Sequence, residues 1–374
     1  MIRHDQEGRL RVLAERGVVV VDPRQTYIGG DVSLERLQAG AVLYPGTRLE
    51  GSKTWLGPQA RVGTEGPATL VDAVLDQGTS VASGYAQGVV LLRGASLGGN
   101  AHVRPGTLLE EEASTAHCVG LKQTLLLSFV TLGSLINFCD CLMAGGSSRR
   151  DHSEVGSGYI HFNFTPWGER GDKATPSLVG DVVEGVFLRQ ARVFLGGSGG
   201  LVGPATVGYG AIAAAGQVWR GSLGAHRLRL EPQRAIDRQL VSGQVDRLRP
   251  RADRNVAYIA QIVALREWYE QVRLPRCAPG QQPVLEAAVG VLRLVIEERR
   301  KQLDRFLVER GAQPLEFELE SNPPCPLDLG SEPQDHVAWV QALPEASVAA
   351  GTRWLQSIVD RVLEQGLAGL PRTD

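Results

Sequence analysis

A repeat of six residues constrains this chain more than any other feature of its sequence. Leu97, Val103 and Leu109 follow one another at six-residue steps, and a small residue comes four places after each of them. The same pattern returns at Leu201 and Val207. An α-helix repeats about every 3.6 residues and a flat strand every two, so neither explains this period. A parallel β-helix does, because each short strand with its turn takes about six residues and points its aliphatic side chain into a continuous core.

Composition limits the classes of protein that the chain can belong to. Its 374 residues are enough for two or three domains, and a net charge of −2 offers no basic field for nucleic acid or an anionic membrane. No apolar run of about 18 or more residues occurs and the first residues are polar, so we expect neither a transmembrane helix nor a signal peptide. Five scattered cysteines favour a reducing cytoplasm over a disulfide framework.

The pattern divides the chain into three parts. Residues 1–17 predict a short helix, and the Gly-punctuated segments of 18–223 predict the β-helix itself. A polar segment at about 143–176 breaks the repeat, so at least part of it should loop outward, as inserts on the functional face of repeat proteins do. In 224–374 glycine thins out and apolar residues take helical spacing, which predicts an α-helical domain that caps the solenoid or assists oligomerisation.

Three motifs occur in order between His102 and Gly216: HVRPGTLLEEEASTAHCVGLKQTLL, VGSGYIHFNF and LVGPATVGYGAIAAAG. They resemble the acetyltransferase half of the bacterial bifunctional enzyme that makes UDP-N-acetylglucosamine. The stretch is also similar to bacterial proteins described as related to UDP-N-acetylglucosamine pyrophosphorylase. The resemblance implies a left-handed β-helix of hexapeptide repeats and a homotrimer that builds its sites between subunits.

The same resemblance implies a pocket for a sugar phosphate. Arg104 and Lys122 match positions that bind the phosphate. Asn163 matches a substrate-binding asparagine, and Lys173 falls near a further phosphate-binding lysine. A phosphomonoester carries close to two negative charges, which fixed cations bind through charge-assisted hydrogen bonds. The alternative is that each cation is a solvated charge on a turn.

Acetyl-CoA, the cofactor that the resemblance implies, would lie along the closing coils. There we name Ser198, Ala213 and Ala214 as candidate contacts. The segment GGSGG at 196–200 could let CoA phosphates approach the backbone, since glycine lacks a Cβ. A turn between coils is the other explanation of this segment.

The chain departs from the resembling family at the catalytic histidine. Ser134 stands where the family has that histidine, in Gly133-Ser134-Leu135. His152 is the best replacement, because Asp151 adjoins it in the polar segment and an imidazole with a pKa near 6.5 suits a base at neutral pH. The alternative is a surface histidine in a loop.

Other polar residues in this region have plainer explanations. We expect packing or supporting roles for His102, His117 and His161, which lie on or beside the predicted coils. Cys139 and Cys141 lack a second pair of ligands at a spacing typical of zinc sites, so we expect coil packing and no metal.

The sequence therefore predicts a protein that binds a phosphorylated or nucleotide-linked amino sugar. If the folded chain also provides a base for the amine proton, we expect it to transfer an acetyl group from acetyl-CoA to the amine of this sugar. Uridyl transfer is not expected, since nothing in 1–17 resembles a Gly-rich nucleotide loop. Two alternatives stay open: a non-catalytic sugar-nucleotide-binding or assembly protein of the same fold, which Ser134 favours, and a pure scaffold. We expect a homotrimer in the cytoplasm with neither nucleic acid nor membrane as partner.

Overall fold

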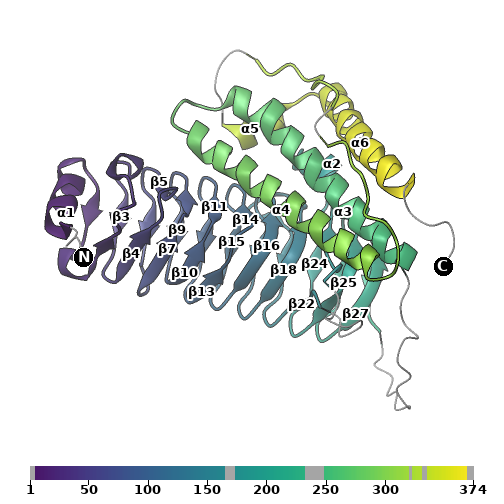
Figure 1. Ribbon diagram of the computed structural model, residues 1–374, viewed down its shortest axis with the longest axis horizontal. Helices are drawn as coiled ribbons and strands as arrows, with labels where there is room; N and C mark the ends of the chain where they lie inside the picture. The colour runs from purple at the N-terminus through teal and green to yellow at the C-terminus, as the bar shows by residue number, and fades with distance from the viewer. Residues whose placement is uncertain (1–4, 165–172, 232–247, 320–321, 331–334, 369–374) are drawn as a thin grey trace.

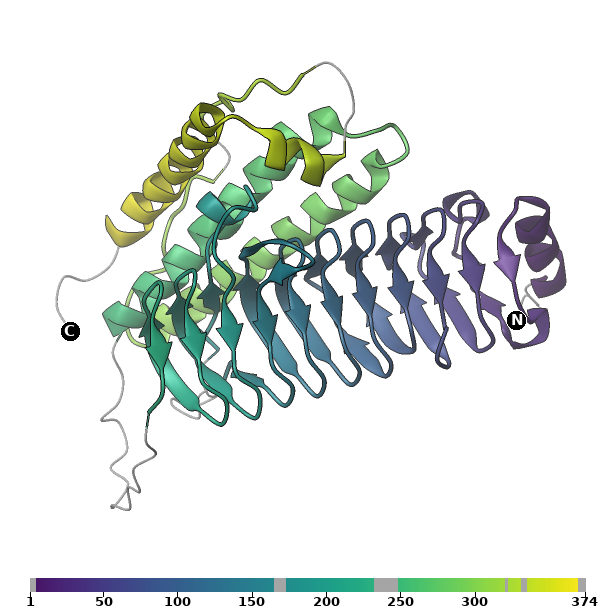
Figure 2. The same ribbon diagram turned by 180° about the vertical axis from the view of Figure 1, so that it is seen from behind.

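The computed structural model describes residues 5–164, 173–231, 248–319, 322–330 and 335–368. In them, short strands wind into a long parallel β-helix, and helices from the C-terminal part of the sequence lie along its side (Figure 1). Seen from behind, the coils follow one another from the N-terminal end in chain order (Figure 2). The predicted fold class, a mainly β solenoid with an α-helical C-terminal region, is confirmed.

One sheet forms the first face of the solenoid, which we call face A. Ser96 pairs with Ser114, eighteen residues later, so three six-residue units make one coil. Each strand of the face pairs in parallel with the strand of the next coil. In spatial order the strands of face A are β1 (Val19–Val20), β3 (Val42–Leu43), β6 (Arg61–Val62), β9 (Ser80–Val81), β12 (Ser96–Leu97), β15 (Ser114–Thr115), β17 (Thr131–Leu132), β21 (Glu154–Val155), β24 (Phe194–Leu195), β26 (Ile212–Ala213) and β28 (Leu228–Arg229).

A second sheet bends around the other two faces, which we call B and C. β16 (Gly120–Leu126) pairs with β13 through its first residues and with β14 through its last, so one strand runs over both faces. Face B contains β2 (Tyr27–Ile28), β4 (Thr47–Glu50), β7 (Ala68–Val71), β10 (Gly84–Gln87), β13 (Ala101–Val103), β22 (Ile160–Phe162) and the first halves of β16, β18 (Asn137–Met143), β25 (Gly200–Val207) and β27 (Val218–Leu223). Face C contains β5 (Trp55–Leu56), β8 (Val74–Leu75), β11 (Val89–Leu91), β14 (Thr107–Leu109), β23 (Ser177–Val179) and the second halves of the long strands.

Aliphatic side chains at the predicted spacing fill the interior of the coils. Leu97, Val103, Leu109, Leu201 and Val207 are all at most 3% exposed. Each such side chain contributes about 1.5–3 kcal/mol when it leaves water. The residues that recur at the six-residue period are therefore the ones whose side chains form the core of the solenoid, as we predicted.

Glycines turn the chain at the corner from face A to face B. A Cβ on Gly98 would lie 2.5 Å from the backbone of Ala116, and one on Gly196 would lie 2.3 Å from the backbone of Ala215. A side chain at either of these two positions would therefore collide with the backbone of the next coil. This stacking explains the repeated Leu-Gly and Val-Gly pairs of the sequence. It also accounts for the first glycine of the GGSGG segment.

The polar segment expected to loop outward is divided by strands of the coil. β19 (Gly146–Ser148) and β20 (Asp151–His152) form an antiparallel hairpin between faces C and A. The chain then returns to the solenoid through β21 and β22, and the part of the polar segment at 165–172 lies outside the described residues. A further short helix, α2 (Val182–Gly185), follows β23.

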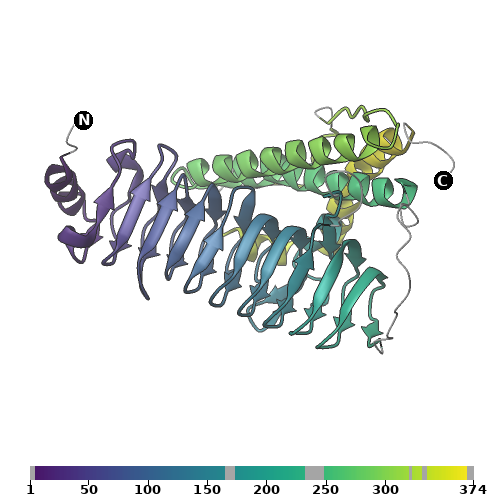
Figure 3. The ribbon, with the colours of Figure 1, turned by 60° about the horizontal axis from the view of Figure 1, so that its bottom comes forward.

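The remaining helices cover one end and one side of the solenoid. α1 (Gln6–Glu15) buries Leu10 and Leu13 against the first coil. α3 and α4 lie along face C, and not across the C-terminal end of the coils (Figure 3). None of the helices among the described residues has the length and apolar character needed to span a membrane. The C-terminal helices are α3 (Leu248–Trp268), α4 (Gln282–Val308), α5 (His336–Ala342) and α6 (Glu345–Ala368), with a π-helical turn at Tyr269–Arg273 and 3-10 turns at Pro23–Gln25, Leu34–Arg36 and Leu274–Arg276.

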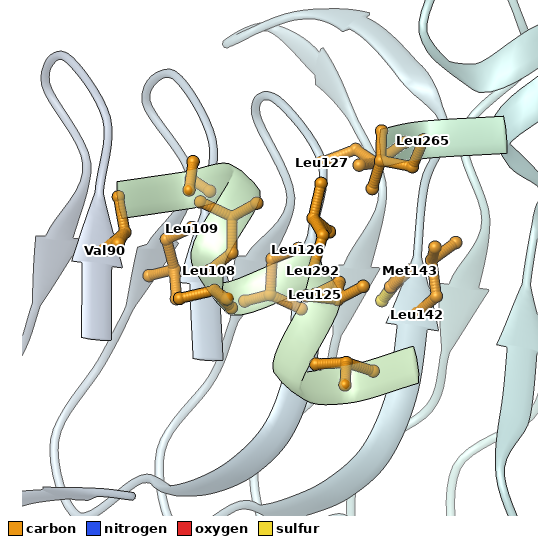
Figure 4. Packing of buried hydrophobic residues seen from close by; sticks show 14 of the residues in the cluster. Val90, Leu108, Leu109, Leu125, Leu126, Leu127, Leu142, Met143, Leu265 and Leu292 are labelled. Carbon is orange, nitrogen blue, oxygen red and sulfur yellow. The ribbon is translucent and has the colours of Figure 1, made fainter. Parts of the chain in front are cut away.

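An outward row of apolar side chains explains why the helices lie on face C. Val90, Leu108, Leu125 and Leu142 pair in register on successive coils, and all are buried. Figure 4 shows this row close to Leu292 of α4. A strand that is covered on both faces carries consecutive apolar residues, because inward and outward side chains both leave water.

Candidate functional site

The two predicted phosphate ligands Arg104 and Lys122 lie on adjacent coils at the edge of face B. The backbone N–H of Arg104 donates to the carbonyl oxygen of Leu121 at 2.9 Å. Lys122 in turn pairs with Cys139 on the next coil. The guanidinium Nη2 of Arg104 donates to Cys139 Sγ at 3.7 Å. The structure therefore brings these two cations together around one thiol.

Both cations are free of carboxylate partners within the described part of the chain. Burial raises the pKa of the Cys139 thiol, the carboxylate of Asp140 raises it further, and the charges of Arg104 and Lys122 lower it. The net direction is upward, so Cys139 is a thiol at neutral pH and not a nucleophilic thiolate. The two positive charges are left to attract an anion.

A shallow pocket of about 400 Å³ extends from Arg104 across face B. Gly120 lies in register between His102 and Asn137 and leaves a gap in this row of side chains. A Cβ on Gly120 would come no closer than 3.9 Å to another residue, so the space is open. The ring of His102 is stacked on Tyr85, with 5.4 Å between the ring centroids, and forms one wall.

Asn163 and Lys173 are joined to the α4 helix through a buried ion pair. Asn163 Nδ2 donates to Asp140 Oδ2 at 2.6 Å. The other oxygen of this buried carboxylate lies 2.9 Å from Arg299 Nη2. Arg299 also donates to the backbone carbonyl of Lys173 at 3.4 Å, while the Lys173 side chain is exposed. Asp140 directly follows Cys139, so this cluster adjoins Arg104 and Lys122.

His152 lies at a different corner of the solenoid, in the hairpin between faces C and A. Its Nδ1 is 2.9 Å from the carbonyl oxygen of Arg149. Asp151 accepts a hydrogen bond from Ser147 Oγ at 3.1 Å, and the expected contact with His152 is not among the interactions of the described residues. Face C separates this hairpin from Arg104 within one chain. A role for His152 as a base therefore stays a prediction that requires another subunit.

Another imidazole lies much nearer to the pocket. His117 Nδ1 is 3.1 Å from the hydroxyl of Ser134, the residue in the family's histidine position. Cys118, the next residue, lines the pocket that Arg104 also lines. We expected only a supporting role for His117. His117 and Ser134 are 17 residues apart, which is the length of one coil in this part of the solenoid. This spacing is the sequence signal that could have identified the pair.

Two further polar residues of this region, His161 and Cys141, lie inside the coils. His161 is buried, its Nε2 lies 2.7 Å from Ser177 Oγ, and burial lowers its pKa. Cys141 is buried as well, and burial raises the pKa of its thiol. The described residues contain no group of three or more histidine, cysteine or acidic side chains that could hold a metal ion.

The residues named for acetyl-CoA are only partly at the surface. Ser198 is exposed in a turn with a φ of 50°, and Ala214 is half-buried. Ala213 does not fit as a side-chain contact, because its methyl group lies in the core. A CoA site at these positions would rest on Ser198, Ala214 and backbone groups, and it stays a prediction.

The fold and the pocket define a class: a parallel β-helix protein of six-residue repeats, in which Arg104 and Lys122 lie together on one face without a carboxylate partner among the described residues. No protein-family model matches the chain. The chain is similar to the "Bifunctional protein GlmU" of Nocardia farcinica, with 30% identity over 223 residues, 59% of this chain and 40% of that protein. The GlmU proteins of Mycobacterium sp. strain KMS (30% over 236 residues) and Geobacillus sp. strain WCH70 (25% over 232 residues) match 63% and 62% of this chain. The chain spans less than half the length of these curated relatives. The resemblance inferred from the motifs is therefore confirmed as a similarity to GlmU proteins.

Proposed function

We propose that face B binds the phosphate of a phosphorylated or nucleotide-linked amino sugar. One observation carries the proposal: Arg104 and Lys122 lie on adjacent coils, without carboxylate partners in the described structure, beside the hollow at Gly120. The similarity to GlmU proteins supports it, since the motifs that contain both cations resemble the sugar-phosphate site of that family. The Oδ1 atom of Asn163 would orient the sugar, and the exposed Lys173 would add a third cation.

Binding can be tested by titration calorimetry with glucosamine 1-phosphate and with UDP-N-acetylglucosamine. Lys122→Glu should weaken binding by about tenfold or more, because a hydrogen bond to a charged group contributes about 1.5–3 kcal/mol. Arg61→Glu is the matched control, since Arg61 is an exposed cation on face A. Equal losses in both variants, or unchanged binding in Lys122→Glu, would contradict the proposal.

We further propose that the bound amino sugar accepts an acetyl group from acetyl-CoA. In this reaction the amine nitrogen attacks the thioester carbonyl carbon, a base takes the amine proton, and CoA leaves as its thiol. His117 is the candidate base within one chain, because it contacts Ser134 and directly precedes Cys118, which lines the pocket. His152 remains the candidate across a subunit boundary, with Ser198 and Ala214 near the CoA.

Mass spectrometry of reaction mixtures with acetyl-CoA and glucosamine 1-phosphate tests the transfer. A positioned base contributes about 10²- to 10⁴-fold in rate, so His117→Gln should lower product formation by that order and leave ligand affinity nearly unchanged. His152→Ala serves as the parallel variant. The variant that loses activity identifies the base.

A non-catalytic binding protein is the second candidate. Ser134 in the histidine position favours it, since a hydroxyl is no base near neutral pH. Ligand binding without any acetylated product would establish this function. In both cases we propose a homotrimer, and the free cysteines of the chain agree with a reducing cytoplasm.

A further inference from the structure

A second cavity lies between the solenoid and the helical region, away from face B. It has a volume of about 360 Å³, and we call it the junction chamber. Asp76, Arg93 and Glu111 reach it from successive coils at the corner between faces C and A. Arg276 enters from the turn after α3, and His336 from the start of α5.

Most charged side chains around the junction chamber are already paired. Arg273 is buried between Glu110, at 3.4 Å, and Glu111. Arg93 Nη2 lies 2.6 Å from the carboxylate of Asp335. These pairs attach the helical region to the solenoid and leave little charge for a ligand.

Arg276 is the exception among the cations. Its side chain is 5% exposed, its Nε donates to the carbonyl oxygen of Leu329 at 3.0 Å, and its guanidinium lies 3.7 Å from the ring centroid of Trp339. It forms no ion pair with any described carboxylate, and its Nη2 has no hydrogen-bond partner there. A buried guanidinium without a counterion is costly, so an anion in the chamber would stabilise it.

Asp76 is the corresponding exception among the acids. It is 7% exposed, and its Oδ1 accepts the backbone N–H of Gln77 at 2.7 Å. It forms no ion pair with a described cation. Burial raises the pKa of Asp76 and the neighbouring Glu111 raises it further, and these effects outweigh the backbone N–H of Gln77 and the more remote charges of Arg273 and Arg93, which lower it. A cation beside this carboxyl would hold it in the ionised form.

His336 supplies an uncharged polar group to the same chamber. Burial lowers the pKa of this imidazole, and Arg273, Arg276 and Arg93 lower it further. Its ring packs against Trp268 and Trp339. A neutral imidazole both donates and accepts one hydrogen bond, so it adds specificity and no charge.

We propose that the junction chamber binds a small molecule that carries both an ammonium and an anionic group. Arg276 binds the carboxylate or phosphate, Asp76 binds the ammonium, and His336 hydrogen-bonds the body of the ligand. A pure anion would lie against Asp76 and Glu111, and a pure cation would lie against Arg276. Only a ligand with both charges compensates both unpaired groups. The volume suits a small molecule such as an amino acid or an amino-sugar phosphate.

The cysteines of the chain allow ligand binding in the junction chamber to be measured separately from binding on face B. Cys277 lines the junction chamber and is partly exposed. Cys118 lines the face B pocket and is exposed. Cys325 is partly exposed and lines neither, so it is the internal reference. Alkylation by iodoacetamide, followed by peptide mass spectrometry, gives the rate at each thiol in the intact protein.

The probes are the common α-amino acids, glucosamine 1-phosphate, glucose 1-phosphate and glucosamine. We expect an amino acid or glucosamine 1-phosphate to slow alkylation of Cys277 about tenfold relative to Cys325 at about ten times its Kd, since only unliganded protein reacts. Glucose 1-phosphate lacks the ammonium and glucosamine lacks the anion, so neither should protect Cys277. Protection of Cys277 by either of them to the same degree would overturn the assignment.

The same experiment separates this proposal from the proposed function. Protection of Cys118 alone would support the face B site and count against the chamber, whereas protection of Cys277 alone would do the reverse. Asp76→Asn should abolish protection of Cys277. Asp72→Asn is the matched control and should keep the protection, because Asp72 lies on the same coil as Asp76 but does not line the chamber. If Asp76→Asn does not fold, the wild-type footprint still decides, because absence of protection by every probe overturns the proposal.

Discussion

Glycines of the solenoid differ in what an added side chain would meet. Gly98→Ala places a Cβ within 2.5 Å of the backbone of the next coil, whereas Gly120→Ala meets nothing closer than 3.9 Å. We expect Gly98→Ala to lower the free energy of unfolding by about 1–3 kcal/mol, and Gly120→Ala to leave it nearly unchanged. Urea denaturation measures both. Equal stabilities of the two variants would contradict the close stacking of coils at the A–B corner.

His161 makes a prediction about pH. Because burial lowers its pKa below 6.5, the unfolded chain binds the proton more readily, so its contribution to stability is complete above pH 6.5 and is lost as pH falls below it. Asp76 and Asp181, whose pKa values burial raises, act with the opposite sign. The stability difference between wild type and His161→Gln should therefore shrink by about 1 kcal/mol between pH 7.5 and 5.5. Denaturation of both proteins at the two pH values checks this, and a constant difference would refute it.

At the scale of elements, the contact between α4 and face C attaches the helical region. Leu292 of α4 is buried near the outward row of face C, while Leu294 on the same helix is exposed. We expect Leu292→Ala to lower the free energy of unfolding by about 2–5 kcal/mol, and Leu294→Ala to change it little. Thermal and urea unfolding provide the measurement. A comparable effect of both changes would mean that α4 is not held by this face.

At the scale of the whole molecule, an exposed apolar row on face A supports the proposed trimer. Phe194, Ile212 and Leu228 pair in register on the last coils and are all exposed. Ile212→Glu should shift the mass measured by light scattering from that of a trimer toward that of a monomer, because a charge would be buried in the interface. Ser96→Glu, a polar outward position on the same face, is the control. A monomeric wild type would contradict the proposal directly.

The sequence predicted the solenoid because its core is local. Each coil repeats one short pattern, so inward positions such as Leu97 and Val103 follow from spacing alone. The resemblance of the motifs to a known family pointed to Arg104 and Lys122, and the structure places these two residues one coil apart at the same edge. The hairpin partners of His152 did not follow from its adjacency to Asp151, because neighbouring strand residues point in opposite directions.

What the sequence by itself determined was the period and the core, both set by contacts between consecutive coils, whereas the pair of cations on face B was inferred from the resemblance to a known family. Only the tertiary structure decided where the helices lie, because paired aliphatics such as Leu108 and Leu109 do not reveal which of them faces inward or what covers the other. It also decided that Arg276 and Asp76 share one chamber, although 200 residues separate them. Such a site forms only when the helical region packs against the coils, so the spacing of residues along the sequence does not predict it.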